Sequence, residues 1–245
     1  MQYFSVNKEV ILGNQIINKG VSLEICSSAT YSSDWCTLDI TEELLSKLSL
    51  ESLSPSKVFL GYDGSYDEVF SGFLASAKTN PIILKDDTVF LENTVISKSF
   101  VDATFQEAIT YCLTKSGINS FTLPSKGMGK KSFTINKKSA IAAIKEIKRL
   151  WNISEKHYFE KHHFYLGNES TQTKTYKFTY GINIISLDQT RGKGWKMTIP
   201  ALPYLRHSTK FVLDHPKISG TFNIQKVTHQ VDDAGFTRTI IEFEV

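Results

Sequence analysis

Three histidines lie within one short stretch of the chain, a spacing that raises the question of a metal site. His157, His162 and His163 share this stretch with Glu155 and Glu160. A structural zinc ion needs three or four ligands that converge on one point. If the stretch forms a hairpin, the adjacent His162 and His163 point to opposite sides, so at most two of the three histidines converge. No cysteine or His-Glu-x-x-His helix completes a ligand set, which favours exposed hairpin histidines.

A glycine-rich loop is the next candidate, because Gly127-Met128-Gly129-Lys130-Lys131-Ser132 resembles a phosphate-binding loop at first sight. That motif has a glycine five residues before the Gly-Lys pair and Ser or Thr directly after it. This chain has Pro124 and Lys131 at those places. The segment also leads into Phe133-Thr134-Ile135, which predicts a strand, whereas phosphate binding uses a helix N-terminus. We therefore interpret the segment as a solvated basic loop.

Acidic residues offer no better site. Asp63, Asp67 and Glu68 surround a predicted turn, but Gly64 is misplaced for the spacing of a calcium-binding loop. Carboxylate pairs of glycosidases meet in space, and nothing in this sequence singles out a pair. Gly-x-Ser-x-Gly and Cys/His signatures are absent. We predict no catalytic, cofactor-binding or metal-binding residues, no cofactor, and a protein that is not an enzyme.

The cysteines are odd in number, and they form no Cys-x-x-Cys motif. Cys26, Cys36 and Cys112 are predicted to be buried, reduced thiols. Cys26 and Cys36 could meet across a hairpin, but a reducing compartment argues against a bond. Residues 1–10 lack the cationic-then-apolar pattern of a signal peptide, so we expect a protein that is made and kept in a cytoplasm.

Composition places the chain among ordinary globular proteins of one large or two to three small domains. Of 245 residues, 41% are hydrophobic and 22% charged, which excludes a disordered or collagen-like chain. The net charge of +3 hides an asymmetry: residues 1–100 hold 7 Lys+Arg against 13 Asp+Glu, and residues 101–245 hold 21 against 12. This split is too mild for a dedicated nucleic-acid binder. No apolar run is long enough to span a membrane.

The first hundred residues read as short strands. Val21, Leu23 and Ile25 alternate with polar neighbours, which is typical of a half-buried strand. Thr41 is the predicted N-cap of a short helix. Further strands are predicted at residues 36–40, 57–62, 68–77, 82–84, 89–91 and 95–97.

The pattern becomes helical near residue 100. Thr104 and Glu107 form a predicted capping box, and Gly117 suits the left-handed end of that helix. A second helix is predicted from about Ser139 to Trp151, with basic residues towards solvent. A hairpin at residues 157–166 closes this module.

The last segment is again β-like. Strands are predicted at residues 175–180, 182–187, 196–199, 210–213, 221–230 and 236–245. A phase switch near Gln225 predicts a β-bulge, and Asp232-Asp233-Ala234-Gly235 predicts a tight loop with Gly at positive φ. We predict a mainly β (α+β) fold with three segments: residues 1–100, an inserted α/β module at 101–168, and residues 169–245.

The closing hairpin carries a family resemblance. Gly220 to Ile240, with Val227-Thr228-His229, the acidic loop and Gly235-Phe236-Thr237-Arg238-Thr239, resembles the closing hairpin of contractile phage tail hub proteins, the late control protein D family. Val58–Ser76 is similar to the family's early hairpin, and Tyr180–Leu187 to the strand that reopens its β portion. The resemblance is one of pattern and order over most of the chain. Some relatives are longer and carry lysozyme-like domains, so wall cutting is expected to reside in another protein.

This resemblance implies two tail-tube-like β-barrel subdomains that flank the inserted module, and a homotrimer that forms a pseudo-sixfold ring. The ring would join the tail tube to a trimeric central spike in the baseplate of a contractile phage tail or a phage-tail-like bacteriocin (tailocin). The implied partners are the tube, the spike and other baseplate proteins, with the tape measure protein as a further candidate, and neither membrane nor specific nucleic acid. Assembly would occur in the bacterial cytoplasm, and the product would be a virion component or its tail-like equivalent.

Two alternatives stay open. Another tail component of similar type, such as a distal tail or tube-initiator protein, would form a hexamer. The other is a peptidoglycan-degrading enzyme or wall-binding module; lysis of cell walls that is lost when acids such as Asp63 or Glu68 are replaced would indicate the enzyme.

Overall fold

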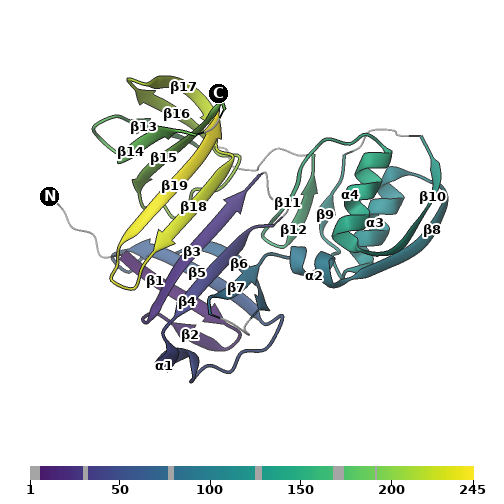
Figure 1. Cartoon of the computed structure of the whole chain (residues 1–245), viewed down its shortest axis with the longest axis horizontal. Coiled ribbons are helices and arrows are strands. Elements are labelled where there is room, and N and C mark those ends of the chain that lie inside the picture. The colour runs from purple at the N-terminus through teal and green to yellow at the C-terminus, as the bar shows by residue number, and fades with distance from the viewer. Residues whose placement is uncertain (1–5, 30–32, 77–79, 125–128, 168–173, 191) are drawn as a thin grey trace. The chain divides into compact units, whose positions relative to one another are not determined.

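The structure, a computed structural model of the whole chain, describes residues 6–29, 33–76, 80–124, 129–167, 174–190 and 192–245. The chain divides into two compact units, residues 1–85 with 169–245 and residues 86–168 (Figure 1). Strands make up 52% and helices 14%, so the predicted mainly β fold class is confirmed. In the described ranges, no helix is both long and apolar enough to cross a membrane.

The first unit combines the two strand groups from the ends of the chain. The N-terminal group comprises β1 (Val6–Leu12), β2 (Gln15–Ile17), β3 (Val21–Ser28), β4 (Trp35–Ile40), α1 (Glu42–Leu45), β5 (Pro55–Tyr62), β6 (Asp67–Ser76) and β7 (Ile82–Lys85). The C-terminal group comprises β13 (Thr175–Thr179), β14 (Ser186–Gln189), β15 (Gly194–Pro200), β16 (Lys210–His215), β17 (Ile218–Asn223), β18 (Lys226–Val231) and β19 (Thr237–Glu244).

One antiparallel sheet runs through both strand groups. Its order is β14-β15-β19-β18-β3-β4-β7-β6-β5-β1-β2. Figure 1 shows β3 beside β18, where the groups meet and where His229 lies opposite Ile25. Among the described strands this ladder does not close into a barrel, since no strand pairs with the outer edge of β14 or of β2. The two tube-like subdomains remain a prediction.

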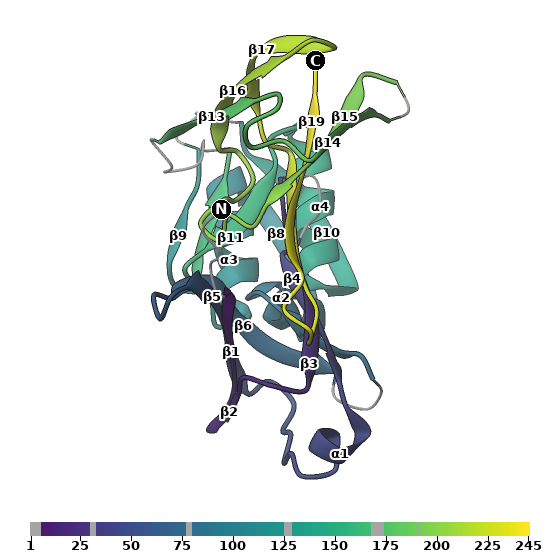
Figure 2. The same ribbon diagram turned by 90° about the vertical axis from the view of Figure 1, so that its left-hand side faces the viewer.

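Two hydrophobic cores form against this sheet, one for each strand group. Ile25, Leu38 and Leu84 belong to the first core. The second core lies between the C-terminal strands and a small sheet in which β13 pairs parallel with β16, and β16 antiparallel with β17. Phe211 of the small sheet meets Phe243 of β19 edge-to-face at 5.1 Å between ring centroids. Figure 2 shows β16 and β17 at the same end of the unit as the C-terminus.

The second unit has its own mixed α/β architecture. Its elements are α2 (Thr88–Asn93), β8 (Val95–Ala103), α3 (Phe105–Lys115), β9 (Phe121–Thr122), β10 (Lys131–Ser139), α4 (Ala140–Leu150), β11 (His157–Glu160) and β12 (His163–Leu166). Helices α3 and α4 pack on each other and on the β8–β10 ribbon, while β11, β12 and β9 form a small sheet. Phe105, Ile144 and Phe164 are fully buried in its core.

Helices with strong local signals lie where the sequence predicts them. The Thr104 hydroxyl oxygen accepts a hydrogen bond from the Glu107 amide at 3.2 Å, and the Thr104 amide donates to the Glu107 carboxylate at 2.7 Å. This is the predicted capping box at the start of α3. Gly117 follows α3 with φ +80°. Ser139 caps α4 by accepting from the Ala142 amide.

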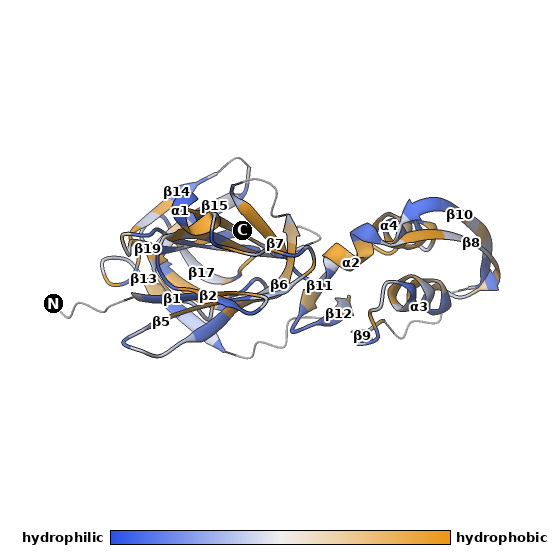
Figure 3. Cartoon of the chain, turned by 90° about the horizontal axis from the view of Figure 1, so that it is seen from below, coloured by the Kyte–Doolittle hydropathy of each residue, from blue (hydrophilic) through white to orange (hydrophobic). Residues whose placement is uncertain are grey.

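The strand predicted at residues 89–91 is wrong, because this segment lies inside α2. The Asp86 carboxylate accepts a hydrogen bond from the Thr88 amide at 3.0 Å, so a side chain satisfies one of the free amides at the start of the helix. Figure 3 shows much of α2 in the hydrophobic colour, and Val89 and Leu91 are buried. A short apolar run fits a buried helical turn as well as a strand. Helix α2 lies at the start of the second unit, which begins at Asp86.

The single bulged strand predicted at residues 221–230 is also wrong. The segment forms β17 and β18, which belong to different sheets. Between them, Ile224 is buried and pairs with Thr209 and Ser208 through backbone hydrogen bonds. The phase switch near Gln225 therefore marks a change of sheet. Thr41 does precede α1, but its side chain forms no capping hydrogen bond.

The strand predicted at residues 182–187 begins only at Ser186, where β14 starts. Residues 180–185 instead form a turn between β13 and β14. The turn is part of a surface described below.

Candidate functional site

The three histidines of the second unit occupy three separate environments. His157 is buried, which contradicts the prediction of an exposed side chain, and its ring stacks on Phe164 at 5.6 Å. His162 Nδ1 lies 2.9 Å from the Asp87 carboxylate. His163 lies between the hydroxyls of Ser120 and Thr122, at 2.7 and 2.9 Å.

Burial controls the chemistry of His157. Loss of solvation, together with the nearby charges of Lys148 and Lys145, lowers the pKa of His157 to about 4. Its Nε2 atom is buried without a hydrogen-bond partner. In the described part of the chain, no group of three His, Cys, Asp or Glu side chains is arranged to hold a metal ion.

The acidic residues and the glycine-rich segment singled out in the sequence take part in turns, ion pairs and strands of the fold. Asp63 lies at positive φ in the β5–β6 turn, and Glu68 pairs with Lys57 at 2.7 Å, as expected of a hairpin loop. Gly127 and Met128 lie outside the described residues. The rest of that segment leads into β10, a strand as predicted, and the Gly129 carbonyl accepts a hydrogen bond from Trp151 Nε1 at 2.8 Å.

The thiols are buried and unpaired, as predicted. Burial raises the pKa of Cys26 and Cys112 to about 12 and raises that of Cys36 as well. Cys36 lies opposite Ile25 in the β3–β4 register, so Cys26 and Cys36 point to opposite faces of the sheet. A disulfide between these two side chains is therefore excluded by the register.

The acidic loop of the closing hairpin is bound to the first strand of the chain. Lys8 Nζ donates to the Val21 and Asp232 carbonyls at 2.6 and 2.9 Å, and it contacts the Asp233 carboxylate at 3.2 Å. That carboxylate also accepts from the Gly20 amide at 2.8 Å. These hydrogen bonds lower the pKa of Asp233, and the bond from Lys8 has the largest effect. We call this arrangement the Lys8–Asp233 clasp.

His229, the histidine of the Val-x-His pattern, holds the sheet to a covering segment. Its Nε2 donates to the Leu205 carbonyl at 3.2 Å, and its Nδ1 accepts from the Thr239 hydroxyl at 3.0 Å. The Thr239 hydroxyl in turn accepts from the Leu202 amide at 2.9 Å. Burial lowers the pKa of His229 to about 4, so the ring is neutral at pH 7.

The covering segment, residues 201–207, connects the two strand groups; we call it the bridging segment. The Tyr62 hydroxyl donates to the Ala201 carbonyl at 2.8 Å, and the Arg206 guanidinium donates to the Glu68 carbonyl at 3.4 Å. With the His229 bonds, these contacts fasten β5, β6, β18 and β19 to one segment. The first unit is therefore a single body with two cores.

Three exposed apolar side chains project from the turn between β13 and β14. Tyr180, Ile182 and Ile185 are 61%, 80% and 51% exposed, and we call this surface the apolar turn. Its backbone is held by Asn183, whose Oδ1 accepts from the Thr179 amide at 2.7 Å. The Ile185 amide donates to the Thr198 carbonyl at 2.8 Å. Contiguous exposed apolar side chains mark interaction surfaces more often than chance.

A shallow groove of about 320 Å³ lies on the polar face of the sheet where β3, β4 and β18 run side by side. Glu24, Asp39, Asp232 and the half-exposed ring of Phe236 line it, and we call it the acidic groove. Its lining contains three carboxylates and no cationic side chain. Glu24 accepts from Gln230, Asp39 from the Asn80 side chain and Asp232 from the Phe236 amide.

Comparison with known proteins gives structural neighbours only. No protein-family model matches the chain, and no curated protein matches its sequence. A tail protein from Neisseria meningitidis MC58 is similar in structure, with a TM-score of 0.71 and 12% identity over 98% of this chain and 97% of that one. The 43 kDa tail protein of prophage MuSo2 from Shewanella oneidensis gives 0.72 and 12% over the same shares.

A third neighbour comes from E. coli. The c3393 protein, described as a type VI secretion component with structural similarity to the T4 phage tail proteins gp27 and gp5, gives a TM-score of 0.65 and 9% identity. The match covers 96% of this chain and 76% of that one. At these identities the likeness establishes the fold, which this chain shares with phage tail proteins.

Proposed function

We propose that this chain is the structural hub of a contractile phage tail baseplate or of a phage-tail-like bacteriocin. Three copies form a pseudo-sixfold ring that joins the tail tube to the trimeric central spike. The observation that carries the proposal is the shared fold with two tail proteins, which extends over 98% of this chain and 97% of each of those proteins.

The layout of the first unit supports this role. Each chain supplies two hydrophobic cores along one sheet, and three chains would supply six β-rich bodies around a threefold axis. Such a ring can present similar surfaces six times to a sixfold tube and three times to a threefold spike. The bridging segment holds the two bodies of each chain together, which suits a part that transmits force between tube and spike.

The partners that follow are the tube, the spike, other baseplate proteins and a tape measure protein, in a particle assembled in the bacterial cytoplasm. The proposed role is mechanical and not enzymatic. It therefore depends on the surfaces through which the chain contacts its partners. The neighbour from E. coli, a type VI secretion component, fits the same class of injection machinery.

The test is the solution mass of the purified chain, measured by light scattering with and without its candidate spike. A species near three times 27.7 kDa for the chain alone, or a complex that holds three copies of the chain beside the spike, is the expected result. A sixfold ring would assign the chain to a tube-like component instead. A monomer that binds none of the tail partners would contradict the proposal. Cell-wall hydrolysis would then be assayed.

A further inference from the structure

We infer that neighbouring copies of this chain meet by seating the apolar turn of one copy in the acidic groove of the next. The inference rests on the proposed homotrimer and names the surfaces that build it. Both surfaces belong to the first unit: the apolar turn lies in the C-terminal strand group, and the acidic groove is lined by residues of both strand groups.

The first step is the shape and rigidity of the apolar turn. Tyr180 packs edge-to-face on the buried His215 ring at 4.7 Å, and Ile182 projects as the most exposed of the three side chains. The Asn183 side chain fastens the turn to β13: its Oδ1 accepts from the Thr179 amide, and its Nδ2 donates to the Lys177 carbonyl at 3.0 Å. A surface held in one conformation loses little entropy when a partner covers it, so such apolar area contributes efficiently to affinity.

The second step is charge. Lys177 and Lys217 are exposed beside the apolar turn, where Asp214 is the neighbouring acid. In the acidic groove, Glu24, Asp39 and Asp232 have no ion-pair partner among the described residues. Lysines around an apolar projection therefore match carboxylates around a groove with one aromatic wall. Complementary charges of this kind set the register of a contact and suppress wrong pairings.

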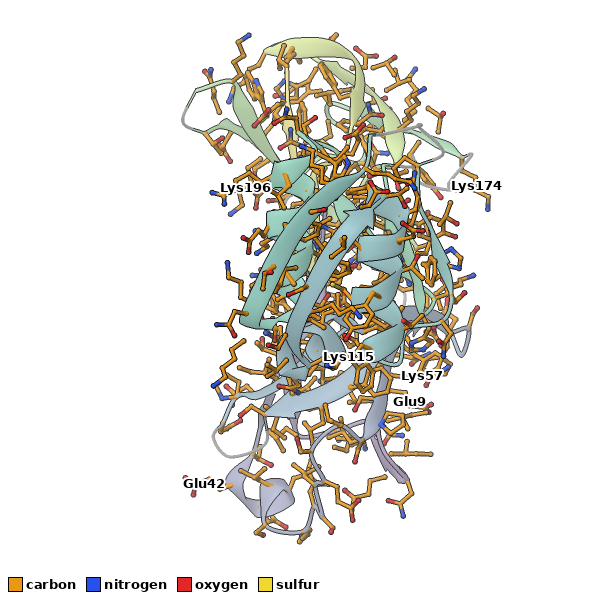
Figure 4. All side chains as sticks on the ribbon, turned by 90° about the vertical axis from the view of Figure 1, so that its right-hand side faces the viewer. Glu9, Glu42, Lys57, Lys115, Lys174 and Lys196 are labelled. Carbon is orange, nitrogen blue, oxygen red and sulfur yellow. The ribbon has the colours of Figure 1, made fainter. Side chains whose placement is uncertain are left out.

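The third step is the choice of a second copy as the occupant. Residues 1–85, which supply most of the groove, hold 6 Lys+Arg against 10 Asp+Glu, whereas residues 169–245 hold 10 against 7. Figure 4 labels Glu9, Glu42 and Lys57 in residues 1–85, and Lys174 and Lys196 in residues 169–245. A head-to-tail contact places opposite charges together. A twofold contact between two apolar turns would instead bring lysines against lysines.

The fourth step is symmetry. A contact between two different surfaces of the same protein is heterologous, and repeated contacts of this kind close into a ring when the rotation allows. An apolar projection and a groove on the same molecule are the parts that such a contact requires. In a closed ring of three copies, each apolar turn occupies one acidic groove, so no turn and no groove stays exposed.

Cysteine pairing tests the contact directly. The double variant Ile182→Cys with Phe236→Cys should form covalent dimers and trimers under mild oxidation, since each contact places one new thiol near the other. The natural thiols are buried and do not compete. The control pairs Val101→Cys with Phe236→Cys, because Val101 is 81% exposed but lies in the second unit. It should stay uncrosslinked.

A second measurement uses charge in place of a covalent bond. Ile182→Asp puts a carboxylate against the acidic groove and should weaken trimer formation at least about tenfold in sedimentation equilibrium. Val101→Asp, the matched exposed control, should leave the assembly unchanged. Both positions are exposed in the folded chain, so neither variant removes a core contact.

The outcomes separate this contact from the proposed function. A wild-type trimer that gives no Ile182–Phe236 cross-link and tolerates Ile182→Asp would overturn the contact and leave the hub intact. A hexamer joined by that cross-link would keep the contact and overturn the trimeric hub. A monomer without cross-links at any concentration would also overturn the contact.

Discussion

His229 and His157 are both buried and have similarly lowered pKa values, but we expect them to have opposite effects on the stability of the fold. His229 uses both ring nitrogens in hydrogen bonds, whereas the Nε2 atom of His157 has no partner. We expect His229→Phe to destabilise the protein by roughly 2 kcal/mol, because the Leu205 carbonyl and the Thr239 hydroxyl lose their partner. His157→Phe should stabilise it by about 1 kcal/mol, because Phe keeps the stack on Phe164 and removes the unpaired nitrogen. Calorimetric unfolding at pH 7 measures both.

The pH dependence of His157 gives a further expected result. The folded protein keeps His157 neutral down to a pKa of about 4, while the unfolded chain takes up a proton below about 6.5. The free energy of unfolding therefore falls as the pH drops from about 6.5 towards 4. At pH 5 the advantage of His157→Phe over the wild type should grow by roughly 2 kcal/mol. An advantage that does not change between pH 7 and pH 5 would contradict a neutral, buried His157.

Single elements show how far the sequence predicts this fold. The starts of α3 and α4 are predictable because Thr104, Glu107 and Ser139 act on amides within three residues of themselves. The α2 segment is mispredicted, because three apolar residues fit either a helix or a strand, and only the structure shows the Asp86 carboxylate accepting from the Thr88 amide at the helix start. The break between β17 and β18 depends on which sheet each half joins, and that choice is made by partners far along the chain.

The surfaces of the proposed contact between copies are equally hard to predict from sequence. The sequence predicts the acidic loop as a turn. It does not predict the contact between Lys8 and Asp233, because these two residues are 225 positions apart in the chain. The acidic groove has the same origin, since Glu24 and Asp39 come from one end of the chain and Asp232 from the other. Local rules find turns and caps, whereas these surfaces exist only after β3 pairs with β18.

The Lys8–Asp233 clasp is an element-scale prediction, because it fastens β1 to the β18–β19 hairpin. The Lys8 side chain is 9% exposed and has three oxygen partners, so Lys8→Met leaves the Val21 and Asp232 carbonyls unsatisfied. We expect a loss of about 2–3 kcal/mol in urea unfolding. Lys19→Met, at an exposed lysine between β2 and β3, is the control and should change stability by less than about 0.5 kcal/mol. Equal losses of stability in the two variants would contradict a stabilising role for the Lys8–Asp233 clasp.

At the scale of the whole molecule, the second unit has the features of an independently folding domain. The second unit, residues 86–168, has its own hydrophobic core around Phe105, Ile144 and Phe164. A fragment of residues 86–168 should therefore fold alone and unfold in one cooperative transition. Ile144→Asp in this fragment should abolish that transition, because it buries a charge without a partner.

The same fragment also separates folding from assembly. The apolar turn and the acidic groove both lie outside residues 86–168, so the fragment should stay monomeric by light scattering at concentrations where the full chain is trimeric. A folded, monomeric fragment assigns association to the two strand groups, because the same purified unit then has a complete core and no partner. A fragment that forms trimers by itself would place the copy-to-copy contact in the helical unit and contradict a ring built from the two strand groups.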